Sequence, residues 1–121
     1  MSLSQPAKAY DLEVRTFEFA KRIRQFVRQL PRTLSNIEDV KQLIRSSGSI
    51  GANYIEANES LGKKDFLMRI KISRKEAKES RYWLRLVHTA SAPGSDAERD
   101  ELAQECTELM NIFGAIIRKC Q

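Results

Sequence analysis

The sequence predicts an all-α fold: a single domain folded as an antiparallel up-down-up-down four-helix bundle. The 121-residue chain contains only three Pro and five Gly, which suits helices throughout. Apolar residues recur at alternating three- and four-residue spacing in four long segments, as amphipathic helices require. Short connections join these segments, and helices joined in this way pack antiparallel. We expect a tail over residues 1–10 and the bundle over residues 11–121.

The first helix is expected over residues 11–30. Pro31 then ends it, because proline has no backbone N–H to donate. Val14 and Phe17 point away from the apolar face of this helix. They are either ordinary exposed apolar residues or part of a second contact surface. The apolar face itself consists of Leu12, Phe19, Ile23, Phe26 and Leu30.

The second helix is expected over residues 36–59. Ser35 and Glu38 have the spacing of a capping box at its start, and Gly62 is a candidate C-cap. Six of the seven residues 46–52 are Ser, Gly or Ala. Since glycine weakens a helix interior by roughly 1 kcal/mol, this composition needs a reason. It predicts close approach of other helices, on more than one side.

The third helix is expected over residues 64–91, ahead of the helix-breaking Pro93-Gly94 pair. Its apolar stripe has heptad spacing. On another side, seven cations fall within an arc of about 120° that contains no acid. This basic face consists of Lys64, Lys71, Arg74, Lys75, Lys78, Arg81 and Arg85.

The fourth helix is expected over residues 96–119, with a second capping box at Ser95 and Glu98. A strict heptad runs along it from Leu102 to Cys120. One flank of this helix is acidic, opposite in sign to the basic face of the third helix. The flank consists of Glu101, Glu105 and Glu108.

The net charge of +5 is unevenly distributed. Residues 63–85 carry nine Lys or Arg against three Asp or Glu. Three interpretations of the basic face remain open: a solvated surface, pairing with the acidic flank of a neighbouring copy, or binding of phosphate groups along an RNA or DNA backbone. Only Tyr82 lies among these cations, so stacking recognition of single strands is not supported.

No apolar run approaches the length of a membrane span, and the N-terminal segment lacks the apolar core of a secretory signal. We therefore expect a cytoplasmic protein with no membrane partner. Cys106 and Cys120 are expected to be reduced core thiols rather than a disulfide or a metal site. His88 is expected in the core or at a helix end.

An enzymatic role is not expected. A catalytic set would need a nucleophile beside a positioned base, and no such set is evident. The Glu-x-x-His pattern of dimetal bundles is absent, and Glu56 with Glu79 makes only a weak case for a metal pair. The glycines of residues 46–52 lie inside a helical pattern, without the strand-to-helix context of a phosphate loop. No cofactor is expected.

The runs IRSSGSIGANYIEA (residues 44–57) and KKDFLMRIKISRKEAKESRYWL (residues 63–84) resemble a known family. It is the 23S rRNA-intervening-sequence protein family, small four-helix bundles related to the accessory proteins of diversity-generating retroelements. The resemblance covers about residues 10–120. Ala57 stands where the family usually has Gly, so the chain resembles a divergent subgroup. The family signature falls on Arg45, Ser49, Asn53, Glu56, Arg74 and Glu79.

This resemblance implies a homo-oligomer that assembles as a ring, expected to be a pentamer, with a basic surface or channel. A protein partner is a further expectation. It leaves the biochemical role open. We interpret the signature residues as a structural polar cluster in which Glu56 pairs with Arg74 and Asn53 bonds nearby, fixing helix register more than adding stability. Alternatively, the polar side of the second helix faces water.

Overall fold

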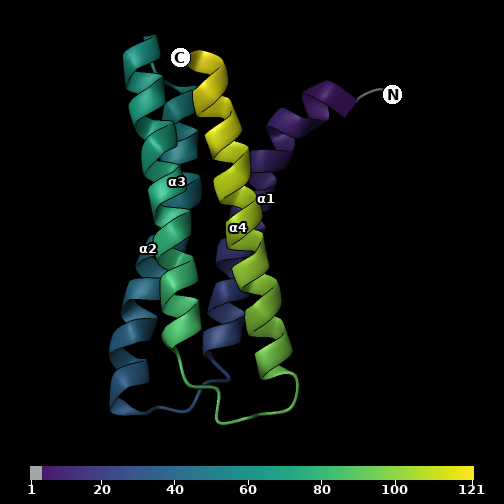
Figure 1. The fold of residues 1–121 in the computed structure, drawn as a ribbon, viewed down its shortest axis with the longest axis vertical. Helices are drawn as coiled ribbons and strands as arrows, with labels where there is room; N and C mark the ends of the chain where they lie inside the picture. Colours follow the sequence, from purple (N-terminus) through teal and green to yellow (C-terminus); the bar gives the residue numbers. More distant parts are fainter. Residues whose placement is uncertain (1–3) are drawn as a thin grey trace.

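Four helices in sequence account for the fold (Figure 1). The structure, a computed structural model, describes the backbone of residues 4–121 and the side chains of residues 12–121. The helices run alternately down and up, with both described ends of the chain toward the same end of the bundle. Each helix packs against the next along the chain, and α1 also contacts α4. The predicted all-α four-helix bundle is confirmed. The bounds are α1 (Ser4–Val27), α2 (Leu34–Asn58), α3 (Lys63–Leu86) and α4 (Ser95–Cys120).

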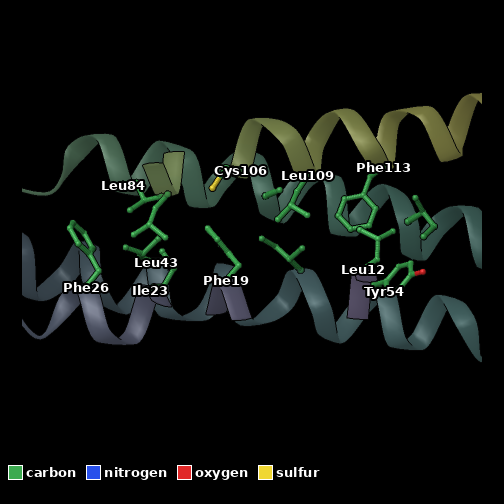
Figure 2. Close-up of a cluster of buried hydrophobic side chains, with 14 of the residues drawn as sticks. Leu12, Phe19, Ile23, Phe26, Leu43, Tyr54, Leu84, Cys106, Leu109 and Phe113 are labelled. Atoms are coloured by element: carbon green, nitrogen blue, oxygen red, sulfur yellow. The ribbon is translucent and has the colours of Figure 1, made fainter. Parts of the chain in front are cut away.

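The core is built from one apolar face of every helix, as the helical periodicity predicts. Figure 2 shows side chains from all four helices meeting along the bundle axis. The ring of Tyr54 lies 6.0 Å from that of Phe113, centroid to centroid, near one end of the row. Side chains with no exposed surface include Ile23, Phe26, Leu43, Ile50, Ile70, Leu84, Leu102, Cys106, Leu109 and Phe113.

The small residues of α2 let helices approach from two sides. Toward α1, a Cβ added at Gly51 would lie only 2.8 Å from Oγ1 of Thr16. Toward α3, the hydroxyls of Ser46 and Ser80 lie 2.8 Å apart, and the Ser73 hydroxyl donates to the carbonyl of Ile50 at 2.9 Å. The close approach predicted from residues 46–52 is therefore confirmed within a single bundle.

Both predicted capping boxes are wrong. The N-cap of α2 is Thr33, whose hydroxyl accepts from the backbone N–H of Asn36, so the helix starts before Ser35. The N-cap of α4 is Gly94, with φ of 80°, and Ser95 is buried inside the first turn. Gly62 precedes α3 as its N-cap instead of ending α2, which Glu59 caps.

Two helix ends also differ from prediction. Residues 4–10 belong to α1 instead of a tail, because Pro6 falls in the first turn, where its missing N–H breaks no bond. Residues 1–3 of the predicted tail lie outside the described residues. At its other end α1 stops at Val27, before Pro31.

Helix α3 stops at Leu86, five residues early, because a buried side chain captures the backbone that follows. Asn36 donates through Nδ2 to the carbonyls of Pro31 and His88, each at 2.8 Å, and its Oδ1 accepts the His88 backbone N–H at 2.9 Å. That N–H is thus unavailable to the helix, and Val87 is extended. Asn36 joins the two loops at one end of the bundle.

Candidate nucleic-acid interface

The seven predicted cations line one side of α3 and point away from the core. Six of them are exposed. The exception is Arg81, which is half-buried and donates through Nη1 to the hydroxyl of Thr107 on α4, at 3.0 Å. The helical spacing thus placed six of the seven cations on an exposed side of α3. The exposed members of the basic face are Lys64, Lys71, Arg74, Lys75, Lys78 and Arg85.

Nearly all of the basic face lacks a carboxylate partner. Lys75 is the exception, with Nζ 3.9 Å from Oε2 of Glu76. In the part of the chain that the structure describes, no ion pair involves the other six cations.

A shallow groove of about 240 Å³ runs beside this face. Ile117 contributes to it from α4, so the groove follows the line where α3 and α4 meet. The cations that line it place ammonium and guanidinium groups beside the side chain of Ile117. Its α3 residues are Lys71, Arg74, Lys75 and Lys78.

The acidic flank of α4 is occupied within the bundle. Arg15 donates to both oxygens of Glu105, at 2.7 and 2.8 Å, and to Glu108 at 2.8 Å. Arg22 donates to Glu101 at 3.2 Å. The bond to Glu105 and the neighbouring carboxylates raise the pKa of Arg15 above its ordinary value, against the opposing effect of burial.

These acids therefore face α1 instead of α3. An arginine held by two carboxylates in a partly buried site is already well compensated. This weakens the interpretation in which the flank pairs with the basic face of a neighbouring copy. The sequence offered no sign of which helix the flank would meet, because α1 and α3 both carry cations.

The predicted polar cluster divides into two separate contacts between α2 and α3. Arg45 lies 3.0 Å from Oε1 of Glu79 and 3.4 Å from Oε1 of Glu76. Further along, Arg69 donates to Oδ1 of Asn53 at 3.1 Å. Sequence reasoning missed Arg69 and Glu76, because nothing in a helical period distinguishes a buried carboxylate from a surface one.

The predicted pair of Glu56 and Arg74 does not form. Both side chains are exposed, and the ion pairs among the described residues do not include theirs. Arg74 lies on the side of α3 that faces α4, whereas Glu56 lies on α2, which meets α3 on another side. Ser49 is half-buried, and its carbonyl accepts from Asn53 Nδ2 at 2.9 Å.

Comparison with known proteins decides the family. A family model of the 23S rRNA-intervening sequence protein matches residues 10–115. This chain belongs to that family. A crystal structure of a protein of unknown function from the S23 ribosomal protein family of Bacteroides thetaiotaomicron is 30% identical to it, with a TM-score of 0.75. That match covers 88% of this chain and 97% of the other. Among curated proteins, none matches significantly.

The two cysteines and the histidine of this chain lie at separate places in the bundle. Burial raises the pKa of the Cys106 thiol to about 12, so it is protonated and unreactive at neutral pH. Cys120 is free and half-buried at the end of α4, and His88 is exposed beyond the end of α3. Within residues 12–121, no three His, Cys, Asp or Glu side chains are grouped as metal ligands. No helix of the described chain has the long apolar stretch needed to span a membrane.

Proposed function

We propose that this chain is a non-enzymatic, self-assembling helical bundle whose α3 binds the phosphate backbone of nucleic acid. The observation that carries the proposal is the basic face, six of whose seven cations have no carboxylate partner among the described residues. Like charges gathered on one helix repel one another, and a stable surface normally intersperses both signs. A polyanion would relieve this repulsion and release its own condensed counterions.

The side chains on this face favour backbone contacts over base recognition. Tyr82 is its one aromatic residue, and its ring stands edge-on to Trp83 with centroids 5.0 Å apart. A row of bases would need several such rings to stack on. The cations supply a sequence-independent affinity that falls steeply with salt. The ligand class is therefore the phosphodiester backbone of RNA or DNA.

Two unlike apolar surfaces support self-assembly. The first, the groove face, borders a 400 Å³ groove between α1 and α2 whose lining includes Gly48, Gly51 and Ala52. The second, the ridge face, lies on α3. Exposed apolar patches of this kind mark contact sites. The groove face presents Val14, Phe17 and Ile55, and the ridge face presents Met68 and Leu86.

Two different faces predict head-to-tail contacts, which close into a ring when the rotation per copy allows it. The family resemblance implies five copies, and a ring would present one basic face from each. Several weak phosphate contacts on one assembly add up to high avidity. Self-assembly therefore strengthens the proposed binding without any further contact in the protomer.

The assembly is tested by mixing two capped variants. Phe17→Glu disables the groove face and Leu86→Glu the ridge face, so each variant alone is expected to be a monomer of 13.9 kDa in light scattering. The Phe17→Glu variant keeps its ridge face and the Leu86→Glu variant keeps its groove face. When the two are mixed, these intact faces can meet, and a heterodimer is expected. A dimer from either variant alone would contradict the head-to-tail arrangement, and a monomeric wild-type protein would rule out assembly.

Binding is tested by fluorescence anisotropy with a labelled duplex of about 20 base pairs, at about 50 and 200 mM salt. The triple variant Lys71→Glu, Lys78→Glu and Arg85→Glu is expected to lose binding. The control carries the same charge change in the loop after α1, at Arg28 and Arg32, and on α2, at Lys41, and should retain binding. If wild-type protein does not bind at low salt, the remaining function is a scaffold for a protein partner, without nucleic acid.

A further inference from the structure

Two guanidinium groups from different helices converge over a glycine of α4. A Cβ at the buried Gly114 would lie 3.4 Å from Nη1 of Arg118 and 3.8 Å from Nε of Arg74. Since both nitrogens lie within 4 Å of one point, they are less than 8 Å apart. Arg118 follows Gly114 by four residues and therefore lies beside it on the helix surface. Arg74 reaches the same point from α3.

Neither of these two arginines is paired with a carboxylate. Among the ion pairs of the described residues, none includes Arg74 or Arg118. On the opposite edge of α4, by contrast, Arg15 meets two carboxylates at 2.7 and 2.8 Å. The protein thus pairs charges where α4 meets α1 and leaves them unpaired where α4 meets α3. Lys71 and Lys78 extend the unpaired region along the adjoining groove.

We infer that one phosphate of a nucleic-acid backbone binds between Arg74 and Arg118, above Gly114, with Lys71 and Lys78 contacting the phosphates on either side. This inference rests on the proposed function. It moves the binding site from the outer side of α3 to the seam, the line beside Gly114 where α3 meets α4. Guanidinium groups suit this role because their planar N–H donors match phosphate oxygens.

The donor-only side chains of this site also determine which groups of a nucleic acid it does not distinguish. Arginine and lysine side chains carry donors and no acceptors, so the site offers no acceptor to a ribose 2′-hydroxyl or a base N–H. Charge also favours the phosphate oxygens over the neutral 2′-hydroxyl oxygen as partners of its donors. It recognises the phosphodiester that RNA and DNA share. Duplex RNA and duplex DNA of the same sequence are therefore expected to bind with affinities within about threefold of each other.

The first test compares two neighbouring cations. Arg118→Gln removes a cation beside Gly114, whereas Lys119→Gln removes another exposed cation that points about 100° away around α4. Both lie in the last turn, so their interactions with the helix dipole are matched. R118Q is expected to weaken duplex binding and to reduce the salt slope by about 1, and K119Q to change neither.

The second test places an acid inside the seam. In Gly114→Glu the new carboxylate would pair with the two arginines and occupy the phosphate position, so binding should fall more than about tenfold. Gly114→Gln has the same size without the charge and should bind within about threefold of wild type. Circular dichroism melts check that both variants fold before their binding is compared.

The outcomes separate this inference from the proposed function. If wild-type protein binds with a steep salt slope while R118Q and G114E bind equally well, the seam is not the site and the outer side of α3 is. If wild-type protein does not bind at about 50 mM salt, the proposed function fails and the inference falls with it. A preference of more than tenfold for RNA over DNA would contradict recognition of the phosphodiester alone.

Discussion

Two glycines three residues apart on α2 should respond oppositely to the same substitution. Alanine is favoured over glycine in a helix by about 1 kcal/mol, so Gly48→Ala and Gly51→Ala start from the same gain. At Gly48 the new Cβ would lie 3.4 Å from Nη2 of Arg24, the mobile end of a long side chain. G48A is therefore expected to stabilise the protein by about 0.5–1 kcal/mol.

At Gly51 the new Cβ would lie 2.8 Å from Oγ1 and 3.2 Å from Cβ of Thr16. Thr16 has little room to move, because it is 1% exposed and its hydroxyl donates to the Leu12 carbonyl at 2.7 Å. Overpacking of this kind costs about 1–3 kcal/mol, which exceeds the gain in helix propensity. G51A should therefore be less stable than wild type by about 1–2 kcal/mol.

Urea unfolding followed by circular dichroism measures both changes, at one protein concentration because assembly adds to stability. Thr16→Ala should remove most of the clash, so that G51A costs much less in the T16A background than in wild type. A coupling energy above about 1 kcal/mol in this double-mutant cycle is expected for residues in contact. Equal stabilisation by G48A and G51A would refute the close approach of α1 to α2.

Three further outcomes are expected. Asn36→Ala should lower the free energy of unfolding by about 2–3 kcal/mol, because it leaves the His88 backbone groups without partners, whereas Ser35→Ala on the exposed neighbour should change it by less than about 0.5 kcal/mol. Equal effects would contradict the role of Asn36. A thiol reagent at pH 8 should label Cys120 and spare Cys106 until the protein unfolds, as mass spectrometry of the labelled chain would reveal. Burial raises the Cys106 pKa from 9.0 to about 12. The neutral thiol's contribution to the free energy of unfolding is therefore fully present below pH 9 and is lost as the pH rises toward 12. The stability of wild type relative to Cys106→Ala should fall over that range, and a constant difference in urea unfolding would count against a buried neutral thiol.

The fold and the exposure of most α3 cations could be predicted because both follow from helical periodicity. The predicted heptad is buried from Leu102 to Phe113, whereas its last members, Ile116 and Cys120, are half-buried and Ile117 is buried instead. The same helical period gathers the cations of α3. Small residues at 46–52 also carried usable information, since a glycine in a helix interior has a cost that packing must offset.

The remaining features depend on which helices become neighbours. Thr33 and Ser35 are both acceptable N-caps, and the choice between them depends on Asn36, which must reach His88 across the sequence. Glu56 and Arg74 looked complementary in charge, yet they lie on sides of the bundle that do not meet. The partners of Arg15 lie 90 and 93 residues away, and one sequence holds no signal for such a pairing.

The central claim is that α3 presents its cations to a phosphate backbone. The most direct measurement is the slope of log binding constant against log salt for wild type and for the triple variant Lys71→Glu, Lys78→Glu and Arg85→Glu. Each lost phosphate contact should reduce the slope by about 0.9, so a steep wild-type slope and a triple variant that is flatter by about 2–3, or without measurable binding, are expected. Equal slopes, or no wild-type binding at low salt, would contradict the claim.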